Sequence, residues 1–312
     1  MKNTIKSLTL NYIDIIHFVP LIIDVLMTGG TLTIHMPGDM SVTTAGIWNP
    51  ERRRVSFGNG KTEIPSISTF AGCGFYNGAV AYWLKPLFRA VGAVGSCNCD
   101  CNGCYAKSMT RIPGVSLMYL LNTLECRINP VRFYDLCMHE ILSEMPGVER
   151  VRIHDSGDFM TVSEYLTIEK LCMEYPGINF ATYTKRSDIV TRGLTERRPD
   201  NLILSGSPWY ENGACKCPGL YPDLCQQFIY DDGTVPELAK LPHCPAVNLF
   251  GERTGITCNR CRWCYTRHDG KRRAVYAHDT ATRARWNKRI DAAFANASLS
   301  DLLTVAGLLA RV

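Results

Sequence analysis

Short strands alternate with helices along residues 148–207, and this alternation limits the fold more than any other feature of the chain. The segment "VERVRIHDSGDF" (148–159) predicts a strand that ends in a polar, glycine-containing turn. After it, the expected elements are a helix at 162–175, a strand at 178–184, a short helix near 186–196 and a strand at 201–207. This order is typical of parallel βα units, so we expect an α/β fold. Two further helices are predicted ahead of it, at 115–127 and 130–145.

In parallel βα folds, ligands bind beyond the carboxyl ends of the strands. Three polar segments fall at these ends: "HDSGD" (154–158), "YTKR" (183–186) and "SGSPW" (205–209). The small residue Ser205 in the last of them would allow close approach of a cofactor. The sequence therefore predicts that its chemistry takes place at this edge of the sheet.

His154 and Asp155 are the candidates for binding a substrate or moving a proton at that edge. A strand-end histidine bonded to the backbone would explain His154 equally well. Lys185 and Arg186 are placed to meet a carboxylate or a phosphate, and a solvated turn would explain both equally well.

A second constraint is the cysteine-rich stretch "SCNCDCNGCYA" at residues 96–106. Cys97, Cys101 and Cys104 form a C-x3-C-x2-C motif, whose three thiolates suit three irons of a [4Fe–4S] cluster and leave the fourth iron open. The alternative is a structural zinc site that also uses Cys99. Four ligands within eight residues would strain a tetrahedral site, so the spacing favours the cluster.

A second set of cysteines occurs near residues 244–264, and it comprises Cys244, Cys258, Cys261 and Cys264. Its C-x2-C-x2-C spacing with a remote Cys-Pro is typical of bacterial ferredoxin sites, so we expect a closed auxiliary cluster, with zinc as the alternative. The looser group Cys215, Cys217 and Cys225 could replace one of these ligands. We interpret Cys126, Cys137 and Cys172 as core residues on helical faces.

Four stretches together resemble the phage-encoded gene product 88 family, which is itself similar to radical S-adenosylmethionine (SAM) proteins. They are "SCNCDCNGCYAKSMTR", "VRIHDSGDFMTVSEY", "INFATYTKR" and "TCNRCRWCY". The resemblance covers roughly residues 64–280. It implies a partial TIM-like (βα)n barrel of the radical SAM type with a cluster loop after the first strand, followed by a Cys-rich C-terminal subdomain.

The resemblance also implies where SAM would bind. Ser156, Gly157 and Asp158 fall at the Gly-Gly-Glu position that contacts the SAM amino group in radical SAM enzymes. The chain departs from that pattern in two ways. Gly103 stands where an aromatic residue usually precedes the third cysteine, and Tyr105 follows that cysteine instead; Cys99 is additional. With Lys185 and Ser205, Tyr105 completes the set of cofactor-binding candidates.

The number of cysteines and the N-terminus bear on the cellular compartment. Fifteen cysteines is an odd count in a chain of 312 residues, and their metal-ligand spacings argue against a secreted disulfide scaffold. Thiolate-bound metal implies a reducing compartment, so we expect a cytoplasmic protein. The apolar stretch 12–27 is interrupted by Asp14, Pro20 and Asp24, which predicts a short packed helix and no membrane span.

Positive charge is concentrated near the C-terminus. Residues 251–290 carry eleven Lys/Arg against three Asp/Glu, a net charge of +8 in a chain whose total is +5. A basic face of this kind suits nucleic acid or an acidic redox protein, although a solvated helix face explains it equally well.

These observations predict four regions. They are an N-terminal extension at 1–63, in which Met40 is an alternative start; a βα core with the cluster loop at 64–210; a Cys-rich subdomain at 211–270; and a basic helical tail at 271–312. The predicted function is a radical SAM-like iron–sulfur enzyme supplied by a flavodoxin or ferredoxin, acting on an unidentified nucleotide, nucleic acid or peptide. The alternative is a non-catalytic zinc or iron–sulfur protein that binds nucleic acid.

Overall fold

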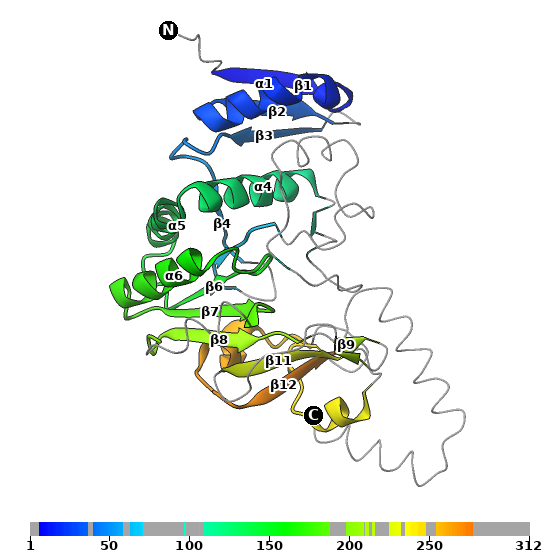
Figure 1. The fold of residues 1–312 in the computed structure, drawn as a ribbon, viewed down its shortest axis with the longest axis vertical. Coiled ribbons are helices and arrows are strands. Elements are labelled where there is room, and N and C mark those ends of the chain that lie inside the picture. Colours follow the sequence, from blue (N-terminus) through cyan, green and yellow to red (C-terminus); the bar gives the residue numbers. More distant parts are fainter. Residues whose placement is uncertain are drawn as a thin grey trace, which may run out of the picture.

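The chain folds into a mixed α/β structure. The computed structural model describes residues 6–36, 40–58, 63–70, 97, 106, 109–110, 112–187, 198–208, 210–211, 214–215, 225–231, 235–247 and 254–276. Within these residues the strands form a seven-stranded sheet, a three-stranded sheet and a two-stranded pair. Figure 1 shows the three-stranded sheet at one end of the molecule and the last strands of the large sheet toward the other.

The seven-stranded sheet has the order β12-β11-β8-β7-β6-β5-β4. Its strands are β4 (Val55–Ser56), β5 (Ser66–Ile67), β6 (Arg150–Ile153), β7 (Asn179–Thr184), β8 (Leu202–Gly206), β11 (Gln226–Asp231) and β12 (Arg272–Tyr276). All neighbours from β5 to β12 are parallel, and β4 pairs antiparallel with β5. The predicted parallel βα arrangement is therefore confirmed. Among the described strands β4 and β12 remain the two edges, so no closure into a barrel is seen.

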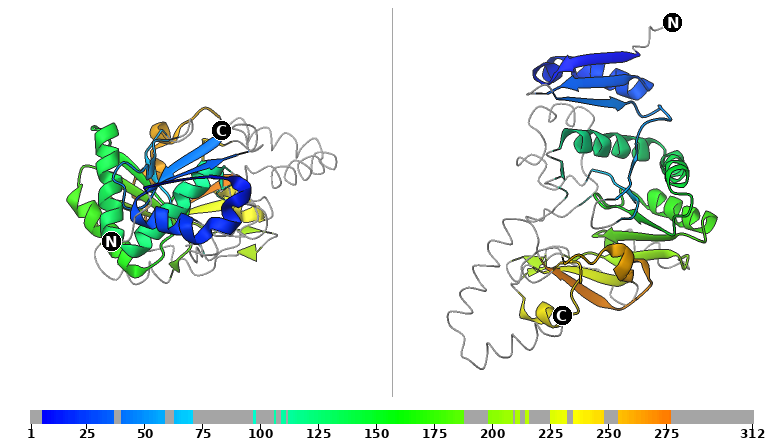
Figure 2. Two further views of the ribbon diagram at one scale, coloured as in Figure 1. Left: turned by 90° about the horizontal axis from the view of Figure 1, so that it is seen from above. Right: turned by 180° about the vertical axis from the view of Figure 1, so that it is seen from behind.

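Three helices cover one face of this sheet or lie beside it, as Figure 2 also shows. They are α4 (Pro113–Ile128), α5 (Pro130–Glu144) and α6 (Val162–Glu174), and all three were predicted from the sequence. Asn129 caps α5 by accepting a hydrogen bond from the Arg132 amide at 3.0 Å. Apolar residues of α5 and α6 pack on Val151, Phe180 and Leu204 to form the main core. The predicted short helix near 186–196 falls largely outside the described residues.

The opposite face of the sheet is covered by the second cysteine segment. This segment contains α8 (Cys258–Cys261) and the 3-10 helix η5 (Trp263–Tyr265). Tyr265 packs with Ile64, Ala181 and Ile203 in a small separate core. The two faces of the sheet are therefore buried by different parts of the chain.

Regular structure also occurs within the predicted Cys-rich subdomain and at the start of the predicted tail. Strand β11 continues the large sheet, and β12 occupies positions assigned to a helical tail; β9 (Tyr210–Glu211), β10 (Ala214–Cys215) and the 3-10 helix η4 (Pro236–Lys240) also occur there. The sequence of β11 begins with Gln226 and Gln227, which are buried although they are polar, so it does not read as an apolar strand. Residues 277–312 of the predicted tail lie outside the described residues.

The N-terminal residues form a small unit with its own sheet. Its elements are β1 (Ser7–Asn11), the 3-10 helix η1 (Tyr12–Asp14), α1 (Ile15–Thr28), β2 (Thr31–His35) and β3 (Ser41–Ala45). The apolar stretch 12–27 largely becomes α1, as predicted, and the helix ends at Gly29 in the left-handed conformation with φ 84°. In the described part of the chain, no helix is both long and apolar enough to cross a bilayer.

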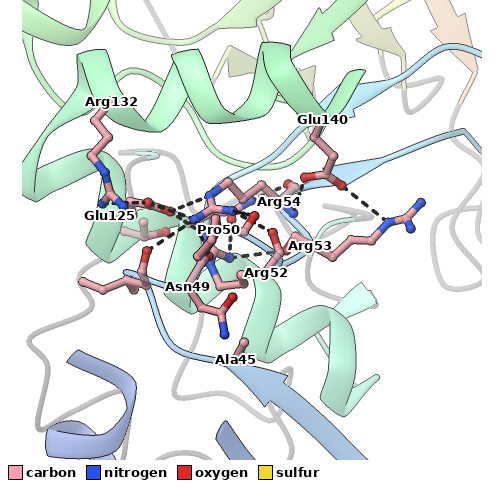
Figure 3. A network of polar contacts seen from close by, with 12 residues as sticks. Ala45, Asn49, Pro50, Arg52, Arg53, Arg54, Glu125, Arg132 and Glu140 are labelled. Atoms are coloured by element: carbon pink, nitrogen blue, oxygen red, sulfur yellow. Dashed lines mark hydrogen bonds and ion pairs between the residues drawn. The ribbon is translucent and has the colours of Figure 1, made fainter. Parts of the chain in front are cut away.

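A buried ionic cluster joins the segment after β3 to the helices (Figure 3). Arg52 and Arg54 are both buried, and each donates to Glu125 Oε2 of α4, at 2.5 and 2.9 Å. Arg132 of α5 adds a third guanidinium, 3.3 Å from the other carboxylate oxygen of Glu125. Arg54 also donates to the backbone carbonyls of Arg52 and Asn49. The Glu125 carboxylate, together with Glu140, which accepts from the Arg54 amide at 2.9 Å, therefore fixes the path of the chain between the N-terminal unit and β4.

Gly46 is required where the N-terminal unit closes on α1. A Cβ atom at this position would lie 2.3 Å from the carbonyl oxygen of Leu26 and 2.9 Å from Gly29 Cα, and both of these are backbone atoms that cannot swing away. We predict that Gly46→Ala lowers the free energy of unfolding by about 1–3 kcal/mol through overpacking. Urea denaturation measures this change.

The matched control is Gly147→Ala, because a Cβ at Gly147 meets nothing within 4 Å and this glycine is exposed. We expect that substitution to change stability by less than about 0.5 kcal/mol. Equal effects of the two substitutions would contradict the steric explanation.

Candidate functional site

The carboxyl ends of β5, β6, β7 and β8 lie side by side and carry the predicted polar residues. The Thr69 amide, just after β5, donates to the Ser156 carbonyl at 2.9 Å. The Ser207 amide, just after β8, donates to the Thr184 carbonyl at the end of β7, at 2.8 Å. The structure therefore brings the 154–158 turn, Lys185 and Ser205 to one edge of the sheet, which we call the carboxyl edge.

The first cysteine motif lies mostly outside the described residues. Cys101, Cys104 and Tyr105 fall there, as does Cys99. Cys97 is described and is partly exposed. In the chain, the motif follows β5, the first parallel strand of the seven-stranded sheet, and precedes α4. None of the described cysteines forms a disulfide bond.

His154 is held in a buried polar network and not at the surface. Its Nε2 lies 3.1 Å from Glu164 Oε1 and its Nδ1 lies 3.2 Å from Thr182 Oγ1. The ring also packs edge-on against Phe159, with centroids 4.7 Å apart. The backbone of His154 has φ 60°, a conformation that residues other than glycine seldom adopt. The contacts of both ring nitrogens show that this histidine organises the strand end, which favours the structural interpretation over proton transfer.

Glu164 is the centre of that network, although the sequence analysis did not select it. The Glu164 carboxylate is buried and accepts hydrogen bonds from the Tyr134 hydroxyl at 2.8 Å and from the Met160 amide at 2.7 Å. The Cys126 thiol lies 3.5 Å from the same carboxylate. Burial alone would raise the pKa of Glu164, but the hydrogen bond and positive charge of His154, with these donors, outweigh it and hold the pKa below its usual value.

The local sequence explains why Glu164 was missed. Thr161 caps α6 by accepting from the Glu164 amide at 3.1 Å, so "TVSE" reads as a capping box, in which the glutamate serves only the backbone at the helix start. The Glu164 side chain instead turns inward toward Met160 and His154. The capping pattern locates the start of the helix, but it gives no sign of the burial.

Asp158 is also buried, and its carboxylate is occupied by the protein. It accepts hydrogen bonds from the Thr184 hydroxyl at 2.6 Å, the Lys185 amide at 2.7 Å and the Phe159 amide at 2.8 Å. Burial raises the pKa of Asp158, and the charge of His154 and these hydrogen bonds offset the rise only in part. Gly157, with φ 93°, allows the tight turn that aims Asp158 at the end of β7.

Asp155 points to the other face of the sheet. Its carboxylate pairs with Arg152 at 2.9 Å, and the Arg152 guanidinium lies 4.8 Å from the Tyr183 ring centroid. Burial and the neighbouring Asp155 raise the pKa of Tyr119, while the Ser68 and Ser156 hydroxyls act in the opposite direction. Arg152, Tyr119 and Tyr183 therefore belong to the surroundings of the candidate site. Arg152 and Tyr119 lie inside a predicted strand and a predicted helix, which gave no functional signal in the sequence. Tyr183 begins the "YTKR" segment at a predicted strand end but was not itself selected as a candidate.

Lys185 and Ser205 lie on the neighbouring strand ends. The Lys185 ammonium donates to Ser207 Oγ at 3.3 Å, which connects the ends of β7 and β8. Ser205 is buried, and its hydroxyl accepts from the Gln226 side chain of β11 at 3.0 Å. Gln226 in turn accepts from the His268 amide at 2.9 Å. Ser205 therefore contributes to the packing of β8 on β11 as well as to the carboxyl edge.

The second cysteine set is only partly gathered. Cys258 and Cys264 both pack against the Tyr265 core, and Cys244 follows the residue that bridges to β12. Burial, with the nearby thiols of Cys244 and Cys258, raises the pKa of Cys264 to about 12. Cys261 instead accepts a contact from the Arg273 guanidinium at 3.7 Å. Among the described residues, no three His, Cys, Asp or Glu side chains are grouped closely enough to hold a metal ion.

The chain thus has a largely parallel α/β sheet with a polar carboxyl edge, and in the sequence a cysteine motif follows strand β5. The family model described as gene product 88 matches residues 71–218, and this match supports the predicted resemblance to that family. The matched region contains the first cysteine motif and every candidate of the carboxyl edge, but not the cysteines at 244–264. It is shorter than the span 64–280 expected from the sequence. No curated protein and no solved structure matches the chain.

The buried Glu164 carboxylate should make stability depend on pH in a defined direction. Because the folded-state pKa of Glu164 lies below its ordinary value of 4.5, its ionised carboxylate contributes fully to the free energy of unfolding above about pH 4.5. This contribution is lost as the pH falls through the folded-state pKa. We predict that Glu164→Gln lowers the free energy of unfolding by about 3 kcal/mol at neutral pH. The difference from the original protein should shrink in acid, as measured by urea denaturation at a series of pH values.

Tyr134→Phe provides the control for this experiment. It removes one hydrogen-bond donor but keeps the carboxylate, so it should cost about 1 kcal/mol and preserve the acid dependence. A Glu164→Gln difference that stays constant into the acid range would show that Glu164 is not ionised in the folded protein.

Proposed function

We propose that the protein is an iron–sulfur enzyme of the radical SAM type that acts on a substrate still to be identified. One observation carries this proposal: Cys97, Cys101 and Cys104 follow the first parallel strand and precede a series of βα units whose carboxyl edge is polar. The match to the gene product 88 family covers this same region. A structural metal site would not need to lie at the edge where ligands gather in βα folds.

The order of the strands supports a partial TIM-like barrel. From β5 to β12, each parallel strand is added on the same side of the previous one, in chain order. A doubly wound sheet would reverse direction at a switch point, whereas a barrel is wound in one direction throughout. The Cys-rich segment 258–265 would then lie on the concave side, because it covers the face opposite α5 and α6.

The donor set of the first motif fits a cluster with an open iron. Cys97, Cys101 and Cys104 supply three thiolates, and Cys99 would point away from them. When bound, such a cluster supplies the electron that breaks a carbon–sulfur bond of SAM and releases a carbon radical. An external donor, a flavodoxin or a ferredoxin, would have to reduce it. Thiolate ligation of this kind requires a reducing compartment, so we place the protein in the cytoplasm.

The residues of the carboxyl edge would bind and orient SAM. The Asp158 carboxylate already accepts three hydrogen bonds, which uses most of its acceptor sites. We therefore assign Asp158 to holding the turn in shape, and the contact with the SAM amino group to Ser156 and the Gly157 backbone. Lys185, next to the same turn, has the charge to bind the SAM carboxylate. Ser205 and Tyr105 remain further candidates for cofactor contacts.

We propose that Cys244, Cys258, Cys261 and Cys264 form an auxiliary site for a second [4Fe–4S] cluster. Cys258 and Cys264 already lie on one buried surface, and metal binding there would release the proton of each ligating thiol. The contact of Cys261 with Arg273 would have to open for this thiol to join the site. Zinc is the alternative metal for this set of ligands.

Anaerobic reconstitution with iron and sulfide tests the proposal. We expect brown protein with about eight irons per chain, and about four in Cys101→Ala. The matched control is Cys172→Ala, because Cys172 is a buried core thiol on α6 and its loss should leave the iron content unchanged. In the reconstituted protein, dithionite should support reductive cleavage of SAM to 5′-deoxyadenosine, and Cys101→Ala should abolish that cleavage.

Two results would overturn the proposal in different ways. Colourless protein that holds stoichiometric zinc would establish the alternative, a metal-stabilised protein without radical chemistry. Iron-loaded protein that never cleaves SAM would support the iron–sulfur cluster but exclude the proposed radical SAM activity. Loss of all iron in Cys101→Ala would show that the two cysteine sets are not independent sites.

A further inference from the structure

Positive side chains gather at the end of the large sheet that is opposite the candidate site. Arg150 begins β6, and its guanidinium donates to the Asn259 side chain of α8. Lys271 and Arg272 stand at the start of β12, where the Gln227 amide of β11 donates to the Lys271 carbonyl at 2.8 Å. These contacts place α8 and the start of β12 at the amino ends of the parallel strands.

The turn that connects η5 to β12 lies at the same end. Arg198, which precedes β8, binds Asp269 through Nη2 at 2.8 and 3.0 Å. Arg267 pairs with Asp200 at 3.1 Å and with Asp269 at 2.6 Å. Residues 266–270 are therefore fixed beside the amino end of β8.

Four of the cations in this segment have no acidic partner among the residues that the structure describes. Between residues 254 and 276 there are six Lys/Arg, and Asp269 is the only acidic residue. Arg267 uses that aspartate, and Arg273 lies inward against Trp263. The remaining four are exposed, and no carboxylate in the described part of the chain lies within ion-pair distance of them; they are Arg260, Arg262, Lys271 and Arg272. We call these four residues the amino-edge basic surface.

The two segments that carry this surface are fastened together. The Arg273 guanidinium of β12 lies 4.7 Å from the Trp263 ring centroid and contacts Cys261. The Trp263 ring stacks on His268 with centroids 5.2 Å apart. Arg260 on α8 and Arg262, between α8 and η5, therefore keep a fixed relation to Lys271 and Arg272 at the start of β12. The ring of Trp263 is already engaged, so this surface offers charge and not a stacking platform.

We propose that the amino-edge basic surface binds the phosphate backbone of nucleic acid without sequence preference. Three of its four cations are arginines, whose planar guanidinium groups match phosphate oxygens in pairs. Protein–protein interfaces normally have an apolar centre, and Ile256 is the one large apolar side chain exposed between residues 254 and 276. The surface therefore fits a polyanion better than it fits an acidic protein. This inference does not depend on the proposed function.

Fluorescence anisotropy of the full chain with a short, labelled duplex DNA of mixed sequence tests the proposal. If all four cations contact phosphates, the logarithm of affinity should fall with the logarithm of salt concentration at a slope of about −3.6. Affinity should then drop by about 100-fold between about 50 and 200 mM salt. Arg260→Gln should reduce the slope by about 1, and the combined variant of all four positions should abolish binding.

Lys170→Gln is the matched control, because Lys170 is exposed on α6 and its loss changes the net charge equally. It should leave the salt slope unchanged, and equal weakening by Lys170→Gln and Arg260→Gln would overturn the assignment to this surface. Tighter binding of polyglutamate than of DNA would assign the surface to an acidic protein instead. Binding by Cys101→Ala should match that of the original protein, so the result is read independently of the cluster proposed at the first cysteine motif.

Discussion

The buried carboxylate of Glu164 is the interaction on which the candidate site depends. Removing an ionised carboxylate from water costs several kcal/mol unless it is paired and hydrogen-bonded. Glu164 meets that requirement with donors from three places: Tyr134 on α5, the Met160 amide in the turn, and His154 at the end of β6. Each donor can reach the carboxylate in only one arrangement of these elements. The charge therefore specifies how α5, α6 and the strand end come together.

The unusual backbone at His154 follows from the same requirement. A histidine in the left-handed region is less stable than in an extended strand, and such a conformation persists only when its surroundings hold it. Here the ring nitrogens are held by Glu164 and Thr182, and the turn that follows is held by Asp158 through Thr184 and Lys185. The turn therefore has one shape before any ligand arrives. A preformed turn loses little conformational entropy on binding, which is an advantage for a cofactor site.

Glu125 on α4 is in the opposite electrostatic situation. Two buried guanidinium groups, Arg52 and Arg54, converge on its one carboxylate, so positive charge is in excess. Burial lowers the pKa of Arg52, and the neighbouring charge of Arg54 lowers it further, while Glu125 acts against both. The buried positive charge of Arg54 is also offset by backbone carbonyl oxygens, which accept hydrogen bonds from its guanidinium. Both networks are polar, and both connect helices to other parts of the chain.

Sequence patterns predicted the parts of this fold that depend on local order, and failed where tertiary contacts decide. Helices α4, α5 and α6 and strands β6, β7 and β8 follow from apolar periodicity, proline at helix starts and glycine-containing turns. Strand β11 did not, because its buried Gln226 is satisfied by Ser205 and by the His268 amide, which are distant in sequence. Glu164 was missed for a similar reason, because its local sequence matches a helix-capping pattern and does not show that the side chain is buried. Buried polar residues are stabilised by partners that no sequence window contains.

The two functional proposals concern opposite ends of the same sheet. Strand β7 has six residues, so the carboxyl edge and the amino-edge basic surface are separated by roughly 20 Å along the strands. The sheet between them is packed on both faces, by α5 and α6 on one and by residues 258–265 on the other. A nucleic acid held at the amino ends could therefore reach the carboxyl edge only by passing around the outside of the sheet. Its phosphate contacts would place a distant part of the polymer and would leave the polar strand ends free for a cofactor, so binding and chemistry can be altered separately.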